Sequence, residues 1–187
     1  ADGLGVLAAI HPALKPGPGA LAALGKTPVE AEGTLYALAV LTVALAPEEA
    51  EQLVARLQPP REWREVILAA PRFRSVTDFL IAAGVPPGQV VEALDVFPLP
   101  VLLAQREVAS PGLLHSRLDD YLTRLRHVQP ECDGNDLVRA GVSEGPEVGV
   151  LLRELRTARL DGRVQTKDEE LAMVRARLSS RPPAPQT

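Results

Sequence analysis

The segment of the sequence best suited to bind a ligand is a short glycine-rich turn followed by an arginine-rich helix. Gly145 and Pro146 precede a helical pattern, and proline is favoured at the first helical position because its missing N–H is not needed there. Free backbone N–H groups at the positive end of a helix bind phosphate, so the turn could hold a phosphate backbone without reading bases. Gly149 lies inside the expected helix, where glycine costs about 1 kcal/mol relative to alanine. We therefore expect another backbone to approach Gly149 closely, from this chain or from a nucleic acid.

Arginines surround this turn and would supply the positive charge. Arg139 precedes the turn, and Arg153, Arg156 and Arg159 rise along successive turns of the helix, away from its apolar face. A planar guanidinium suits bidentate contacts with phosphate. The alternative is that these arginines form ordinary ion pairs with the acidic residues nearby, Glu147, Glu154 and Asp161.

No set of side chains has the spacing of a catalytic or metal site. His11, His115 and His127 are far apart, and none has a paired nucleophile. Cys132 is the only cysteine, which excludes a disulfide within the chain and disfavours a cysteine-based metal site. Residues 133–136 resemble the start of a calcium-binding loop but lack its later glycine and glutamate. We expect no catalytic residue, metal or cofactor in this chain.

The composition favours helices packed on helices. Of the 187 residues, 46% are hydrophobic and only 3% are aromatic, so the core must consist of Leu, Val and Ala. With so few aromatic residues there is no platform on which single-stranded bases could stack. The net charge of −4 argues mildly against nucleic acid, although nearly all the cations are arginine.

No uninterrupted apolar run is long enough to cross a membrane, and no signal peptide is visible. We therefore expect a cytoplasmic protein with no membrane partner. The sequence also opens inside an apolar helical pattern without an initiator methionine, and we expect it to be cut from a longer protein.

Helix signals recur along the chain and strand signals are nearly absent, which predicts an all-α fold: an irregular array of about nine or ten short helices with no sheet. Capping boxes at Thr27–Glu30 and Thr166–Glu169 predict two helix starts. Residues 15–26, rich in Pro and Gly, are expected to form a loop. One turn of helix is expected at 136–140 and a long helix at 146–161. Helix ends are expected at three glycines, Gly84, Gly141 and Gly162.

The run GNDLVRAGVSEGPEVGVLLRELRTARLDG resembles the C-terminal signature of class II tRNA nucleotidyltransferases, that is, CCA-adding enzymes, and of related poly(A) polymerases. In that family the signature reads Gly-x-Asp-Leu, a Gly, a Gly-Pro-x-Val/Ile-Gly turn and a leucine-rich helix that ends in Leu-Asp-Gly. The matching residues are Gly134, Asp136, Leu137, Gly141, Gly145, Pro146, Val148, Gly149, Leu152, Leu155, Leu160, Asp161 and Gly162. The opening GLGVLAAIHPAL resembles, less specifically, the last helix of the family's neck.

The resemblance implies that residues 1–14 end a neck helix, 15–130 form a helical body, and 131–187 form a helical tail with a frayed C-terminus. The parent enzyme would add nucleotides to tRNA 3′ ends, and its Mg²⁺ and ATP or CTP would belong to a head domain outside this chain. Body and tail would hold the acceptor and T arms of tRNA, or a similar structured RNA, by backbone and shape. The RNA-binding residues would then be Gly141, Gly145, Val148, Gly149, Arg139, Arg153, Arg156 and Arg159.

Two alternatives stay open at this point. The chain could be a helical scaffold that dimerises or docks another protein, which an exposed apolar patch would indicate. It could also bind DNA through a helix-hairpin-helix turn. The sequence does not distinguish parents that add CC, A, CCA or poly(A), and it leaves the oligomeric state open.

Overall fold

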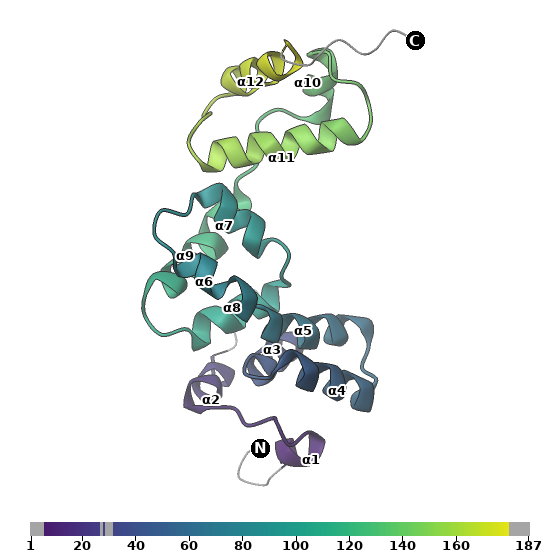
Figure 1. Cartoon of the computed structure of the whole chain (residues 1–187), viewed down its shortest axis with the longest axis vertical. Coiled ribbons are helices and arrows are strands. Elements are labelled where there is room, and N and C mark those ends of the chain that lie inside the picture. Colours follow the sequence, from purple (N-terminus) through teal and green to yellow (C-terminus); the bar gives the residue numbers. More distant parts are fainter. Residues whose placement is uncertain (1–5, 27, 29–31, 180–187) are drawn as a thin grey trace. The chain divides into compact units, whose positions relative to one another are not determined.

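The computed structural model describes residues 6–26, 28 and 32–179. These residues form twelve α-helices and one 3-10 turn, without a strand (Figure 1). The all-α prediction is therefore confirmed, with slightly more helices than the nine or ten expected. The chain divides into two compact units. Unit 1 comprises Ala1–Val85 and Glu92–Thr123, and unit 2 comprises Pro86–Val91 and Arg124–Thr187.

Unit 1 is built around one central helix. Helix α3 (Gly33–Thr42) packs on both α5 (Arg61–Arg72) and α8 (Leu99–Val108). The helices around them are α1 (Val6–Ile10), α2 (Pro18–Leu24), α4 (Pro47–Leu57), α6 (Arg74–Ile81) and α9 (Leu113–Thr123). One part of the core gathers small and aliphatic side chains, as the composition predicts: Leu7, Leu14, Leu45, Ala50, Leu53 and Ile67.

The predicted loop at 15–26 is wrong, because most of it forms helix α2. Pro18 occupies the start of this helix, where its missing N–H costs nothing. Ala23 is buried, and the Tyr36 hydroxyl donates a hydrogen bond to the Ala23 carbonyl at 3.1 Å. Tertiary packing thus stabilises a segment whose Pro and Gly content favours a loop. The capping box expected at Thr27–Glu30 lies outside the described residues.

Unit 2 contains the start of helix α7 (Pro87–Leu94), the 3-10 turn η2 (Leu125–His127) and three further helices. These are α10 (Gly134–Arg139), α11 (Pro146–Leu160) and α12 (Lys167–Ser179), seen in green to yellow in Figure 1. Inward side chains of these helices and of the segments beside α10 form a second core of Cys132, Leu137, Val142, Leu151, Leu155 and Val174.

Two of the three glycines predicted to end helices do so, in left-handed backbone where a side chain would be strained. Gly141 has φ 103° after α10, and Gly162 has φ 72° after α11. After α11, the N–H of Arg163 donates to the Ala158 carbonyl at 2.8 Å, the long-range bond of a Schellman motif. Gly84 also has a positive φ, 75°, but α6 ends earlier than predicted, at Ile81, because Ala82 is already in extended backbone.

In the part of the chain that the structure describes, no single helix is long and apolar enough to span a membrane. Helices α7 and α8 reach the length and apolar composition of a membrane span only when the two are counted together, and they are bent by 113° where they meet.

Candidate nucleic-acid interface

Asp133, in the loop before α10, is the N-cap residue of that helix. The Asp133 carboxylate accepts a hydrogen bond from the Asp136 N–H at 2.8 Å, and the Asp136 carboxylate accepts one from the Asp133 N–H at 3.1 Å. This reciprocal pair starts the helix at Gly134, two residues before the predicted start, because the cap satisfies the first N–H groups. No group of three or more His, Cys, Asp or Glu side chains that could hold a metal occurs among the described residues.

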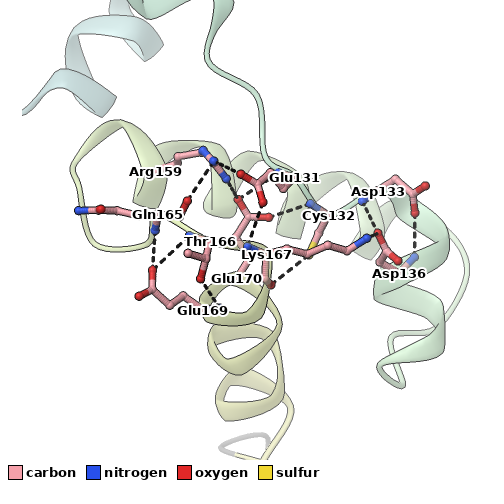
Figure 2. Close-up of polar contacts among 10 residues, drawn as sticks. All are labelled: Glu131, Cys132, Asp133, Asp136, Arg159, Gln165, Thr166, Lys167, Glu169 and Glu170. Carbon is pink, nitrogen blue, oxygen red and sulfur yellow. Dashed lines mark hydrogen bonds and ion pairs between the residues drawn. The ribbon is translucent and has the colours of Figure 1, made fainter.

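A polar network centred on Glu170 joins this loop to α11 and α12 (Figure 2). The Glu170 side chain is fully buried. It accepts hydrogen bonds from the N–H groups of Glu131 and Cys132, at 3.1 and 2.8 Å, and from the Arg159 guanidinium at 2.7 Å. Burial would raise the pKa of Glu170, but these donors outweigh burial and hold its pKa below the ordinary value. Glu170 is therefore a charged carboxylate inside unit 2.

The network also determines the state of two neighbouring groups. The Lys167 ammonium lies 2.6 Å from the Asp136 carboxylate, and this contact lowers the pKa of Asp136 and raises the pKa of Lys167. Burial, together with the nearby Glu170 carboxylate, raises the pKa of the Cys132 thiol to about 11. Cys132 is therefore protonated at neutral pH and is a packing residue of the core rather than a nucleophile.

The predicted capping box at the start of α12 is confirmed. The Thr166 hydroxyl accepts a hydrogen bond from the Glu169 N–H, and the Glu169 carboxylate accepts one from the Thr166 N–H, both at 3.3 Å. Glu169 also accepts the Gln165 N–H at 2.6 Å. These bonds, drawn in Figure 2, fix the start of the helix that carries Glu170 inward.

The turn from Gly145 into α11 has the geometry that its sequence predicts. Gly145 has φ 133°, which favours glycine, and Pro146 begins the helix. The Val148 N–H donates to the Gly145 carbonyl at 3.2 Å, and the Val148 side chain packs against the unit 2 core. Val148 therefore supports the turn from within, and Gly145 and Gly141 are both exposed on the outside.

No backbone of the described chain lies close to Gly149. A Cβ built on this glycine would meet only Nη1 of Arg153, at 4.0 Å. The expectation that another backbone of this chain approaches Gly149 is therefore wrong for the described residues. Their packing does not explain why a glycine occupies this helical position. The glycine leaves an open face at the first turn of a 15-residue helix, next to an arginine.

The four predicted arginines have different surroundings. Arg159 is paired with Glu131 and Glu170 rather than with the three acidic residues considered from the sequence. Arg156 donates to the carbonyls of Val128 and Arg126, at 2.9 and 3.2 Å. Both side chains thus hold unit 2 together.

Arg153 and Arg139 remain at the surface. Arg139 pairs with Asp136 at 3.6 Å, but its side chain is 78% exposed. Arg153 is exposed and forms no ion pair within the described residues, and it borders a shallow hollow together with Arg156, Gln129 and Gly134. Of the four arginines, Arg153 is the one whose side chain forms neither an ion pair nor a hydrogen bond within the described residues.

Charge is divided unevenly between the units. Unit 2 has eleven of the twenty Lys and Arg residues and ten of the twenty-four Asp and Glu residues, a net charge of +1. The remaining nine Lys and Arg residues and fourteen Asp and Glu residues give unit 1 a net charge of −5. The overall charge of −4 therefore conceals a C-terminal unit that is mildly basic.

Gly88, which the sequence did not single out, is a glycine that other side chains do approach closely. A Cβ on Gly88, in the first turn of α7, would lie 2.6 Å from Cγ2 of Thr157 and 2.9 Å from Oδ1 of Asp161. The space is needed because Asp161 accepts the Gly88 N–H at 2.8 Å and so caps α7 from the end of α11. Asp161 is the aspartate of the Leu-Asp-Gly motif, and its partner is 73 residues away, beyond the reach of any local pattern.

Comparison with known proteins gives a likeness of fold. No family model matches the sequence, and no curated protein matches it. Among solved structures, the chain resembles the Thermotoga maritima CCA-adding enzyme complexed with tRNA, with a TM-score of 0.68, 19% identity, and coverage of 95% of this chain and 46% of that one. A CCA-adding enzyme in complex with ATP gives a TM-score of 0.64 at 18% identity, covering 94% of this chain and 45% of that one.

The chain therefore has the fold of a region of CCA-adding enzymes and spans about half the length of these two structures. This agrees with the family resemblance of the residue 134–162 motif, which rests on different information.

Proposed function

We propose that this chain is the C-terminal region of a tRNA 3′-end nucleotidyltransferase and that it holds the acceptor and T arms of tRNA by backbone and shape. The observation that carries the proposal is the match of 95% of the chain to a CCA-adding enzyme solved with tRNA. The tail signature at residues 134–162 supports the placement at the C-terminal side.

The charges of unit 2 favour RNA as the partner. Its net charge is +1, and Arg153 is exposed beside the open face at Gly149. A guanidinium and the positive end of α11 together suit a phosphate group. Gly149 would let the RNA backbone approach the helix more closely than any side chain permits.

Catalysis belongs, in this proposal, to a head domain outside the chain. That domain would bind Mg²⁺ and ATP or CTP, and it would decide whether CC, A, CCA or poly(A) is added. The role of this chain is to position the RNA, which needs no reactive side chain of its own.

A direct binding experiment tests the proposal. The purified chain is titrated into a labelled hairpin that mimics the stacked acceptor and T arms, and fluorescence anisotropy is measured at low salt. We expect saturable binding. If the hairpin does not bind, and sedimentation shows self-association of the chain instead, the helical-scaffold alternative takes its place.

A further inference from the structure

The corner between α5 and α6 presents two arginines on a rigid support. Helix α5 ends at Arg72 and α6 begins at Arg74. Phe73, between them, is 1% exposed, and its ring packs edge-on against Phe97 with centroids 5.2 Å apart. The Phe73 N–H donates to the Ala69 carbonyl at 3.2 Å. Because the residue between them is anchored in the core, both arginines project from a fixed corner rather than from a mobile loop.

Neither of these arginines is neutralised by the described chain. Both are exposed, and neither forms an ion pair or hydrogen bond through its side chain within the described residues. Asp78 lies one helical turn beyond Arg74, but no ion pair joins them. By contrast, Arg61, at the start of α5, lies 2.8 Å from the Glu65 carboxylate.

Arg72 and Arg74 border one hollow, together with Pro47, Pro71 and Ser75. This lining contains two cations and no carboxylate. The hollow beside the neighbouring Arg64 differs, because Glu51 is part of its lining. The Ser75 hydroxyl donates to the Arg72 carbonyl at 2.8 Å, which helps to fix the corner. The result is a local positive spot on a unit whose net charge is −5.

We propose that the Arg72–Arg74 corner is a second phosphate-binding site, on unit 1, which contacts the sugar-phosphate backbone of the RNA. Two guanidiniums on a rigid support, without a carboxylate between them, suit phosphodiester oxygens, which accept paired N–H donors. Such contacts position a nucleic acid and carry no sequence preference. The inference rests on the proposed function, but it names a site independent of the one at Arg153.

The experiment compares charge-matched double variants of the whole chain. Affinity for the acceptor and T arm hairpin is measured across a series of salt concentrations for the wild type, for Arg72→Ala with Arg74→Ala, and for Arg61→Ala with Arg64→Ala. Each double variant removes two exposed arginines from unit 1, and thermal unfolding checks that both fold. If both corner arginines bind phosphate, the slope of log affinity against log salt becomes about two units shallower in the corner variant. The control variant keeps the wild-type slope.

Four results would overturn the inference. Equal changes in the two double variants mean that only overall charge matters. An unchanged slope in the corner variant, with the wild type binding normally, removes this site but leaves the proposed function intact. Absence of hairpin binding by the wild type removes both. A poly-glutamate chain that competes as well as unlabelled hairpin would show that the corner binds any polyanion, such as an acidic protein segment, rather than an RNA backbone.

Discussion

Arg153 and Arg159 show how far residue type and spacing determine the role of a side chain. Both are arginines on α11, two turns apart, and the sequence pattern treats them alike. Arg159 has two carboxylate partners, one of them buried, whereas Arg153 is exposed and has none among the described residues. The partners come from Glu131 and Glu170, in other parts of the chain, so only the folded structure separates a structural arginine from one available to a ligand.

This difference predicts opposite results for two alanine variants. Arg153→Ala should leave the unfolding temperature unchanged, weaken RNA binding and make the salt slope about one unit shallower. Arg159→Ala leaves the buried Glu170 without its cation and should destabilise unit 2 by roughly 3 kcal/mol. Chemical denaturation and hairpin binding of each variant measure both effects. A stable Arg159→Ala protein, or an Arg153→Ala protein with unchanged affinity, would contradict these assignments.

Glu170 predicts acid sensitivity of unit 2. Its pKa in the folded protein lies below the ordinary value of 4.5, so its stabilising effect is complete above that value and is lost as pH falls through the folded-state pKa. Asp136, whose pKa Lys167 lowers, acts in the same direction. The free energy of unfolding should therefore decrease as the pH is lowered below about 4.5.

Amide exchange in α11 and α12, measured against pH, follows unit 2 alone. Glu170→Gln should be less stable at neutral pH and should show a shallower decline in acid. Glu144→Gln, at an exposed position, is the matched control. An identical acid profile for Glu170→Gln and the wild type would show that this carboxylate does not cause the decline.

At the scale of elements, Gly149 and Gly88 occupy the first turns of two helices and should respond differently to alanine. A Cβ at Gly149 meets only the Arg153 guanidinium tip, so Gly149→Ala should stabilise the chain by up to about 1 kcal/mol through helix propensity. If RNA approaches this face, the same change should weaken RNA binding.

Gly88→Ala should cost about 2 kcal/mol, because the new methyl group collides with Thr157 and with the carboxylate that caps α7. Thermal unfolding of the two variants gives the comparison. Destabilisation by Gly149→Ala would reveal a packing contact that the described structure lacks, and a neutral Gly88→Ala would remove the capping role of Asp161.

Local signals predicted most helix ends. Pro146, Gly141, Gly162 and the capping box at Thr166 act on their near neighbours in the chain, and each is found where its pattern places it. Helix α2 was missed because its stability comes from the burial of Ala23, which no local pattern reports. The burial of Glu170 had one signal in the sequence. Glu170 lies four positions before Val174, so the two share one face of α12, and that face is the buried one. The cap between Gly88 and Asp161 had none, because its two halves are far apart in the chain.

For the whole molecule, the proposed function gives this chain the positioning of RNA and leaves the chemistry to a domain outside it. The purified chain should not extend tRNA when it is incubated with Mg²⁺, CTP and ATP, because no pair of carboxylates in its sequence has the spacing of two-metal phosphoryl transfer. Gel analysis of labelled tRNA measures extension at single-nucleotide resolution. Metal-dependent extension that survives stringent purification would refute the prediction.

The central claim, that this chain holds structured RNA by backbone and shape, is tested most directly by competition at two salt concentrations. Unlabelled acceptor and T arm hairpin, whole tRNA and an unstructured strand of equal length compete for the chain against labelled hairpin. We expect the hairpin to compete as well as whole tRNA and the unstructured strand to compete poorly, since 3% aromatic residues give bases little on which to stack. With about three to five phosphates neutralised, log affinity should fall against log salt with a slope of roughly −2 to −4. Equal competition by the unstructured strand, or affinity that does not change with salt, would contradict the claim.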